Sequence, residues 1–405
     1  MKKKIICISL LFILIISGMI LLNNKESKKD NLYINSKELS NNQSLAIFIE
    51  KDNGGYEKTT SIPTKDSGYT LHTGKSICEG NATLSWNKEK WGLEIDNVNK
   101  REIKCYLYFA KGITMGEILA NKNKSTRTDF STILTEDTTG TIYSAEDDYG
   151  TSYYYAGAVK DNWVKFAGYY WRIIRINGDG TIRMIYNGPT TDQTGETTQI
   201  GTSVFNTNNN DNMYVGYQYT SGEVHGRGTD STIKGVLDTW YNNNLKDYSN
   251  YIATGNGANF CNDRQPSTDS SNINGNGGTG TTQTYYATSI RLANSAKSPT
   301  LKCMDTKDKF AISIGLITAD EVAYAGGVWI TDNINYYLYT NQYYWTMSPF
   351  ILNSSGFVSA FSVWDDGKLH SGYVNDFRGV RPVINLKPDT VFVGSGFSSD
   401  PYIVS

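Results

Sequence analysis

The stretch YYWRIIRINGDGTIRMIYNG, Tyr169 to Gly188, decides the fold of the second half of the chain. Its first part alternates Tyr170 and Arg172 with Trp171 and Ile173, which is the period of a strand with two different faces. The segment NGDG supplies residues that adopt positive φ in a tight turn, and TIRMIY returns as a second strand. The pattern predicts a β-hairpin.

The segment DSTIKGVLDTWYNNNL predicts a helix, because its apolar residues recur at helical spacing. Asp230 or Ser231 can cap its amino end. Its apolar face consists of Ile233, Val236, Leu237, Trp240 and Tyr241.

Two shorter helices carry the spacing of a capping box, in which a hydroxyl residue and a glutamate three positions later satisfy each other's backbone. Thr114 and Glu117 have this spacing in ITMGEILANKN, and Thr318 and Glu321 have it in GLITADEVAYAGG. We expect the first helix to connect two domains and the second to lie inside the larger one.

Residues 44–110 contain short runs such as SLAIFIEK, ATLSWN and REIKCYLYFAK, each rich in aromatic or β-branched residues and bounded by turn residues. This pattern is typical of a small β-sandwich. Cys78 and Cys105 both fall in strand-like runs, where they would staple the two sheets together.

The cysteines at 78, 105, 261 and 303 allow three pairings. Their order along the chain favours one bridge in each domain, Cys78–Cys105 and Cys261–Cys303. Each bridge would restrict the unfolded chain and contribute ~3–4 kcal/mol. A catalytic thiol is the less favoured reading, since no histidine lies close to a cysteine in the sequence.

The chain begins MKKKIICISLLFILIISGMILLNN, in which three lysines precede an apolar run from Ile5 to Leu22. As a helix this run would be ~27 Å long, close to the thickness of the bilayer hydrocarbon. No small-residue cleavage site follows, so an uncleaved anchor is favoured over a removed signal peptide. We therefore expect a single-pass cell-membrane protein with extracellular carboxyl-terminal domains, or a secreted protein if the signal is cleaved.

The composition supports export and a β-rich fold. The 405 residues include 38 Gly and 29 Tyr, while only 19% are charged, which differs from the make-up of a helical enzyme. A net charge of −2 provides no basic field for nucleic acid. The expected organisation is a signal anchor at 1–22, a linker at 23–43, a small β-sandwich at 44–110, a helical connector at 111–127 and an α+β domain at 128–405.

Residues from about 110 onward resemble a class of exported bacterial surface proteins of undefined function. The resemblance rests on YYWRIIRINGDGTIRMIYNG, STIKGVLDTWY, GLITADEVAYAGG, YYWTMSP, GVRPVINLK and the ending GSGFSSDPYIV. The order of these segments is similar to the formylglycine-generating-enzyme-like branch of the C-type-lectin fold. The resemblance implies a lectin-like α+β domain, but it implies no activity, because fold alone does not decide function.

The segment YYWTMSPF, Tyr343 to Phe350, predicts a strand with Trp345 in the core and Tyr344 on the exposed face. In GVRPVINLK, we expect Arg381 to make a structural ion pair or backbone hydrogen bonds. Ligand binding by Arg381 is the less favoured alternative.

The turns between the last strands are the expected ligand site, because loops at one end of a rigid scaffold can vary without disturbing the core. An aromatic ring beside carboxylate and amide groups suits a sugar or a protein. Asp365 and Asp366 could also hold calcium weakly, although a plain hairpin turn is the simpler reading, and no other cofactor is expected. The candidate ligand-binding residues are Tyr344, Trp364, Asp365, Asp366, His370, Asn375, Asp376 and Arg378.

The absence of a recognisable catalytic motif favours a surface binding or adhesion protein that is held in the membrane by its amino-terminal helix and binds a glycan or protein ligand. The alternatives are a surface enzyme of unrecognised chemistry and a pseudopilin-like structural subunit.

Overall fold

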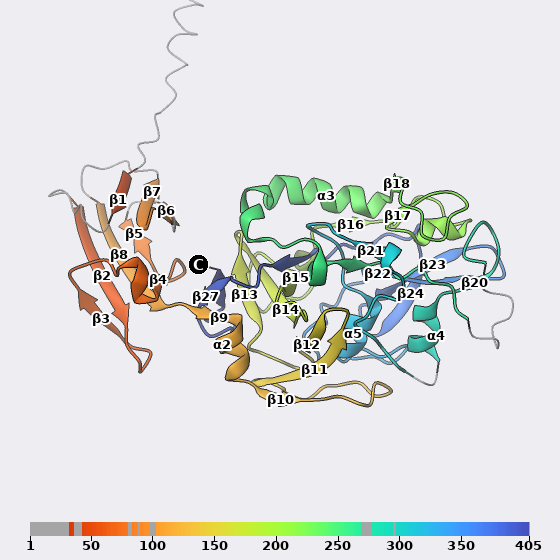
Figure 1. The fold of residues 1–405 in the computed structure, drawn as a ribbon, viewed down its shortest axis with the longest axis horizontal. Coiled ribbons are helices and arrows are strands. Elements are labelled where there is room, and N and C mark those ends of the chain that lie inside the picture. Colours follow the sequence, from red (N-terminus) through yellow and green to blue (C-terminus); the bar gives the residue numbers. More distant parts are fainter. Residues whose placement is uncertain are drawn as a thin grey trace, which may run out of the picture. The chain divides into compact units, whose positions relative to one another are not determined.

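The structure is a computed structural model that describes residues 32–35, 43–79, 83–87, 90–96, 103–268, 277–294 and 297–404. These residues form mostly β-strands with few helices, which confirms the β-rich prediction (Figure 1). The chain divides between Lys111 and Gly112 into two units, each with its own core. The predicted anchor at 1–22 lies outside the described residues, and none of the described helices is long and apolar enough to cross a membrane.

Two sheets share one hydrophobic core in the first unit. Leu71, Leu107 and Phe109 enter this core from one sheet, and Leu93 and Ile95 enter it from the other. Among the described residues, one sheet has the order β1 (Leu32–Asn35), β7 (Gly92–Asp96), β6 (Thr83–Asn87), and the other has the order β3 (Tyr56–Thr59), β2 (Gln43–Glu50), β8 (Ile103–Lys111), β4 (Tyr69–Leu71), with β5 (Ile77–Cys78) also paired to β8.

The disulfide of this unit is confirmed, but the expectation that it joins the two sheets is wrong. Cys78 lies directly opposite Cys105 in the antiparallel pair of β5 and β8, so the bridge links neighbouring strands of a single sheet. Sequence spacing alone could not separate the two arrangements, because both cysteines fall in strands in either case.

The second unit contains two larger sheets. Among the described residues, ten strands form the first: β10 (Asn123–Ser125), β11 (Thr141–Asp147), β12 (Gly150–Tyr154), β14 (Tyr169–Ile176), β13 (Trp163–Phe166), β28 (Tyr402–Val404), β27 (Val391–Val393) and β9 (Ile113–Thr114) in that order, with β15 (Ile182–Gly188) joining β14 to β26 (Val383–Leu386). Six described strands form the second: β16 (Thr202–Ser203), β25 (Arg378–Gly379), β22 (Tyr344–Leu352), β23 (Val358–Val363) and β24 (Leu369–Tyr373), with β20 (Thr284–Tyr285) paired to β22. Two small described pairs are β17 (Gln218–Tyr219) with β18 (Thr229–Asp230), and β19 (Phe260–Cys261) with β21 (Lys309–Phe310).

The predicted hairpin is β14–β15. Its turn is closed by the Asn177 N–H donating to the Thr181 carbonyl at 2.8 Å, and Gly180 adopts a φ of 86° there. Both faces of the two strands are largely buried, rather than one. The buried arginines Arg175 and Arg183 of these strands are paired with carboxylates, Arg175 with Asp147 and both with Glu321.

Three helices begin where their caps predict. Both capping boxes are present, at α2 (Met115–Ala120) and α5 (Ala319–Ala325), and the Ser231 hydroxyl caps α3 (Thr232–Asn244). A further helix, α4, spans Ala287–Ala293. The residues expected to connect the domains belong to the second unit, because Met115 and Ile118 enter its core and β9 pairs with β27.

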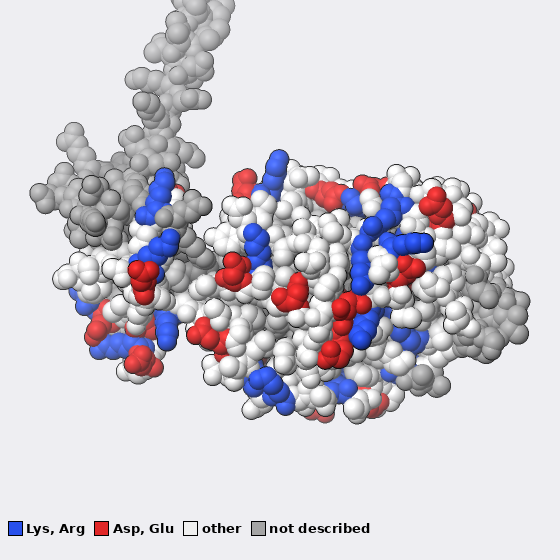
Figure 2. All heavy atoms as spheres, in the orientation of Figure 1, with Lys and Arg blue, Asp and Glu red and all other residues white. Residues whose placement is uncertain are grey.

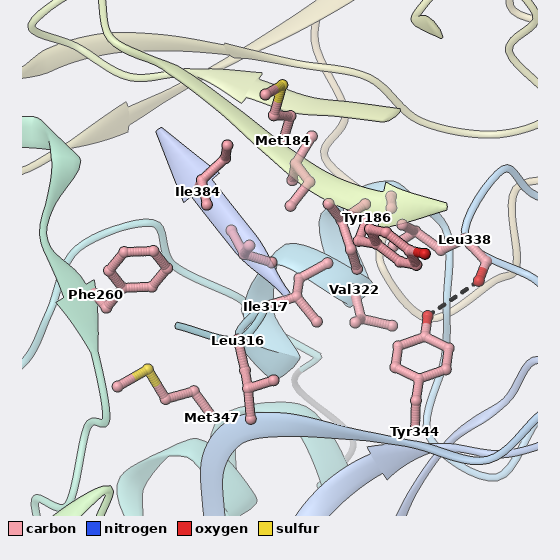
Figure 3. Close-up of a cluster of buried hydrophobic side chains, with 14 of the residues drawn as sticks. Met184, Tyr186, Phe260, Leu316, Ile317, Val322, Leu338, Tyr344, Met347 and Ile384 are labelled. Atoms are coloured by element: carbon pink, nitrogen blue, oxygen red, sulfur yellow. Dashed lines mark hydrogen bonds between the residues drawn. The ribbon is translucent and has the colours of Figure 1, made fainter. Parts of the chain in front are cut away.

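Side chains from both large sheets meet in one core. Met184 of β15 and Ile384 of β26 lie on one side of it, and Met347 of β22 lies on the other, with Ile317 and Val322 between them (Figure 3). This packing fixes the six-stranded sheet, and that sheet carries most of the expected ligand site.

The strand predicted from YYWTMSPF is β22, and Trp345 is fully buried as predicted. The expectation that Tyr344 is the exposed ring is wrong. Its ring is also fully buried and its hydroxyl donates to the Leu338 carbonyl at 3.0 Å (Figure 3). The exposed ring is Tyr343, at 37%, which lies just before β22. Tyr344 is buried because β22 is central in its sheet and is covered on both faces.

Arg381 has the structural role that was favoured from the sequence. It is fully buried and donates to the carbonyls of Tyr186 (3.2 Å) and Leu338 (3.1 Å) and to Asn187 Oδ1 (2.9 Å). It is therefore committed to the fold and is not available to a ligand.

Candidate ligand-binding groove

Four of the expected ligand-binding residues line one groove on the six-stranded sheet: Trp364, His370, Asp376 and Arg378. The groove has a volume of about 490 Å³, within the range of about 300–1,000 Å³ that is typical of small-molecule sites. We call it the aromatic groove. Its other lining residues are Phe350, Ile351, Asn353, Ser359, Ser371, Gly372 and Tyr373.

A column of stacked rings forms the floor of the aromatic groove. The ring centroid of His370 lies 4.0 Å from that of Trp364 and 5.0 Å from that of Trp329. Trp329 in turn stacks on Phe350 at 4.8 Å. Because rings from β22, β24 and two loops pack against each other, the floor is rigid, and a ligand would find it already formed.

The guanidinium of Arg378 lies over three rings. Its central carbon is 5.2 Å from the Tyr343 ring centroid, 5.4 Å from that of Trp345 and 5.8 Å from that of Trp364. Gly372 lies on another side, where an added Cβ would come within 2.3 Å of Arg378 Nε. Arg378 thus brings positive charge to an aromatic surface, and the absence of a side chain at Gly372 makes room for it.

A carboxylate lies beside this cation. Asp376 Oδ2 is 3.4 Å from Arg378 Nη2, and the Asp376 side chain remains 42% exposed. Burial lowers the pKa of Arg378, and the charge of Asp376 opposes that shift. The aromatic groove therefore offers hydrogen-bond donors and acceptors within one site, next to the half-exposed ring of Tyr373.

The two aspartates expected beside Trp364 point elsewhere. They form the turn between β23 and β24, in which Asp366 pairs with Lys368 and Asp365 accepts a hydrogen bond from Tyr343. Neither lines the aromatic groove. Both oxygens of Asp366 already have partners within the protein, since Oδ1 accepts the Lys368 N–H and Oδ2 accepts from Lys368 Nζ.

The remaining expected residues also lie apart from the groove. Asn375 is exposed, and its Oδ1 accepts from Asn209 Nδ2 at 2.9 Å. Tyr344 lies in the core and cannot reach a ligand. Tyr373 and Ser359 also line the groove, although they were not among the expected residues, and they face each other across β23 and β24. The register of the two strands could have indicated them, because residues paired across two strands share one face of the sheet.

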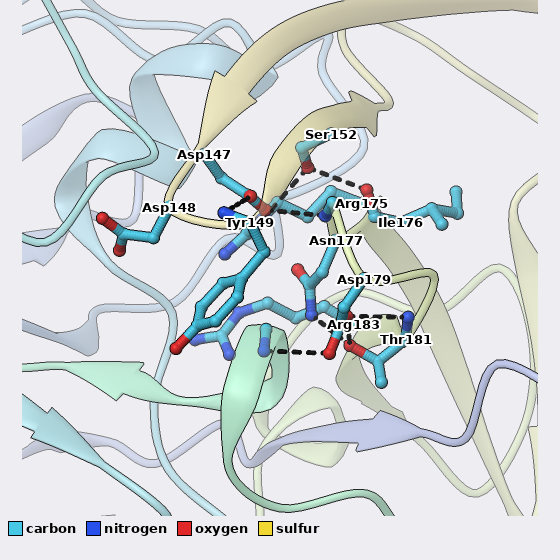
Figure 4. A network of polar contacts seen from close by, with 12 residues as sticks. Asp147, Asp148, Tyr149, Ser152, Arg175, Ile176, Asn177, Asp179, Thr181 and Arg183 are labelled. Atoms are coloured by element: carbon cyan, nitrogen blue, oxygen red, sulfur yellow. Dashed lines mark hydrogen bonds and ion pairs between the residues drawn. The ribbon is translucent and has the colours of Figure 1, made fainter.

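A second hollow is lined by charged residues. Arg175 lies between two carboxylates, with Nη1 3.0 Å from Asp147 Oδ2 and Nε 2.9 Å from Glu321 Oε1. Asp147 and Asp148 turn apart (Figure 4). Asp148 pairs with Lys309 at 2.9 Å. The charged residues that line this hollow are Asp147, Asp148, Asp263, Asp320, Glu321, Arg175, Arg183, Arg291, Lys302 and Lys309.

This charged hollow has room for only a few water molecules, because its volume is about 40 Å³. Arg291 bridges Asp263 and Asp320 at 2.5 Å each, so most of the buried charges in the hollow are already paired. The Cys261–Cys303 disulfide, which confirms the predicted pairing, lines the same hollow. We regard the hollow as a structural network that ties β11, β14, β15 and α5 together.

The exposed surface shows no single-signed field on the face drawn in Figure 2, where basic and acidic side chains are interspersed among uncharged atoms. Within the described part of the chain, no three His, Cys, Asp or Glu side chains come together as metal ligands would. The geometry therefore directs attention to the aromatic groove.

Comparison with known proteins adds no family to this description: no family model matches the chain, and neither the curated proteins nor the solved structures include a match.

Proposed function

We propose that this chain is a cell-surface binding protein whose second unit, with a C-type-lectin-like arrangement, binds a glycan in the aromatic groove. The observation that carries the proposal is the convergence of Trp364, His370, Asp376 and Arg378 on one groove with a floor of stacked rings. Sugar rings present C–H faces that pack on aromatic side chains and hydroxyls that bond to charged and amide groups.

The accessible ring for such packing is Tyr373. It is 44% exposed and lies edge-on against Phe357 at 5.8 Å. Arg378 and Asp376 lie in the same groove and can bond to hydroxyl groups on either side of a sugar ring. Trp364 supports this surface from below, because His370 already occupies one of its faces.

The proposal places the protein at the cell membrane through the apolar run at 5–22. A chain that starts at residue 23 should leave the membrane fraction while the full chain stays in it. Cleavage of the full chain near residue 20 and release of the product would contradict the anchor, although not export.

A glycan array with the purified full chain tests the binding function. Replacing Tyr373 by Ala should weaken any glycan found about tenfold, which corresponds to about 1.4 kcal/mol. Tyr248→Ala is the matched control, because Tyr248 is 39% exposed and packs edge-on against a single phenylalanine, Phe166, at 5.5 Å. Equal binding by the parent and the Tyr373 variant would remove the groove from consideration, and an array without any binding would contradict the function.

A further inference from the structure

Arg172 is a buried cation without a carboxylate partner. Its exposure is 7%, and no acidic oxygen of the described residues lies within ion-pair distance of it. The buried arginines Arg175, Arg183 and Arg264 each pair with a carboxylate. Burying an unpaired charge costs several kcal/mol, so such groups are normally paired or bound to a ligand.

The protein holds Arg172 in a fixed orientation. Nε donates to Asn162 Oδ1 at 2.6 Å and Nη2 donates to the Val159 carbonyl at 2.7 Å. The central carbon of the guanidinium lies 4.2 Å from the Trp163 ring centroid and 5.3 Å from that of Tyr337. The group is therefore clamped between two rings, which leaves one edge of its plane unused.

A count of donors identifies the unused edge. A guanidinium has five N–H donors, and Asn162 and Val159 take two of those of Arg172. Both N–H groups of Nη1 and one of Nη2 remain. Nη1 has no hydrogen-bond partner among the described residues. It is not fully buried, so a ligand can reach it from outside.

The unused edge opens on a groove of about 530 Å³ that Arg172 lines together with Trp163 and Tyr337. We call it the Arg172 groove. Two accessible apolar side chains lie among its polar lining residues, because Ile334 is 58% exposed and Phe397 is 40% exposed. None of its lining residues belongs to the aromatic groove.

The charges near this groove favour a monoanion. A second buried guanidinium, Arg381, also lacks a carboxylate, and it adds to the positive potential at Arg172. Burial lowers the pKa of Arg172 to about 9, so the group is still charged at neutral pH. Asp192 lines the same groove and would repel a dianion, while Lys160 at the rim is already paired with Asp137.

We propose that the Arg172 groove binds an organic carboxylate with an apolar body. The two carboxylate oxygens accept N–H groups from Nη1 and Nη2 in the parallel geometry that a guanidinium fork provides. The apolar body lies against Ile334 and Phe397. Arg381, whose three nitrogens all bond to the protein and which is fully buried, shows what a purely structural arginine in this fold looks like.

Benzoate is the probe, and its binding to the full chain is measured by ligand-observed NMR. Benzyl alcohol, of similar shape but neutral, should bind much more weakly, and inorganic phosphate should not displace benzoate efficiently. Equal binding of benzoate and benzyl alcohol would overturn the role of the guanidinium. Tighter binding of phosphate would overturn the carboxylate class.

Surface variants test the site without disturbing Arg172. Asp192→Asn should tighten benzoate binding about two- to fivefold, the size expected for removal of one screened charge. Asn is a matched replacement, because Asp192 has a φ of 57° and Asn tolerates that region. Ile334→Asp should weaken binding by a similar factor.

The Tyr373→Ala variant serves as a further control. It should leave benzoate binding unchanged, so a failure of the glycan proposal and a failure of this one can be told apart. Unchanged binding in both Asp192→Asn and Ile334→Asp would show that benzoate does not occupy the Arg172 groove and would overturn the proposal.

Discussion

The ring of His370 lies 4.0 Å from the ring of Trp364, centroid to centroid, and stacks on Trp329 from its other side at 5.0 Å. This sandwich joins β24 to the β23–β24 turn and to the loop that follows α5. It forms part of the floor of the aromatic groove, so the protonation state of His370 affects both stability and the site.

Stability should fall in mild acid because of His370. Burial lowers the pKa of His370 below its usual value near 6.5, so the unfolded chain takes up this proton first as the pH falls. The stabilisation is complete above about pH 6.5 and is lost progressively below it. Denaturant unfolding of His370→Gln between pH 8 and 5 should show a shallower pH dependence than the parent. Identical slopes would contradict the buried, neutral imidazole.

Two neighbouring tyrosines, Tyr343 just before β22 and Tyr344 at its start, should respond differently to truncation. Tyr344→Ala should destabilise the fold by about 3–5 kcal/mol, because it removes a fully buried ring and leaves a cavity. Tyr343→Ala should cost about 1 kcal/mol or less, since that ring is exposed. The free energy of unfolding from denaturant titrations measures both, and the reverse order would mean that the strand faces are exchanged.

Two glycines should give opposite results when replaced by Ala. Gly372→Ala should lower the free energy of unfolding by about 1–3 kcal/mol, because its Cβ would come within 2.3 Å of Arg378 Nε, which three rings hold in place. Gly235→Ala should raise the free energy of unfolding by about 0.5–1 kcal/mol, since Gly235 lies inside α3 with nothing within 4 Å of the new Cβ. Melting of both variants measures the contrast, and equal shifts would show that Arg378 moves aside freely.

Glu321 should be among the carboxylates on which stability depends most. Its Oε1 lies 2.9 Å from Arg175 Nε and 2.6 Å from Arg183 Nε, and its Oε2 accepts the Thr318 N–H. Glu321→Gln should destabilise the fold by about 3–5 kcal/mol, because buried Arg183 loses its carboxylate partner and Arg175 loses one of its two. The exposed Glu223→Gln is the control and should change little.

The same carboxylate predicts a pH dependence. Burial alone would raise the pKa of Glu321, but Arg183 and Arg175 outweigh burial, and the pKa is lowered. Its stabilising contribution is therefore present above the unfolded-state pKa of about 4.3 and is lost as the pH falls below that value. The stability difference between Glu321→Gln and the parent should shrink in that range. A constant difference down to pH 2 would contradict the lowered pKa.

The two disulfides should be found intact when the purified full chain is digested without reduction. Removing Cys261–Cys303 by a double Ser substitution should lower the free energy of unfolding by about 4 kcal/mol. Removing Cys78–Cys105 should lower it slightly less, because that bridge encloses a shorter loop. A peptide that joins Cys105 to Cys261 would refute the pairing.

Local signals in the sequence predicted a good part of the fold. Thr114 with Glu117 and Thr318 with Glu321 form their capping boxes, because such contacts depend on residues only three positions apart. The β14–β15 hairpin follows from its own turn residues in the same way. The sequence could not reveal which sheet each cysteine joined, or that β22 would be covered on both faces.

The candidate site was likewise only partly predictable from the sequence. Trp364, His370, Asp376 and Arg378 share a groove because β24 and β25 bring them to one face of the sheet. Asp365 and Asp366 lie next to Trp364 in sequence, yet the turn directs their oxygens to Tyr343 and Lys368.

The sequence by itself determined the β-rich class, the starts of three helices, the hairpin turn and the burial of Trp345. Each of these depends on composition, on local pattern or on contacts between residues close in the sequence. The order of the cysteines favoured the correct disulfide partners among three possible pairings, although the bridges join residues far apart in the chain. Only the tertiary structure decided that Tyr344 is buried and that Arg172 lines a groove without an ion-pair partner of its own. Those outcomes depend on which distant segments cover a side chain, and burial and charge pairing across such distances leave no periodic signal in the sequence.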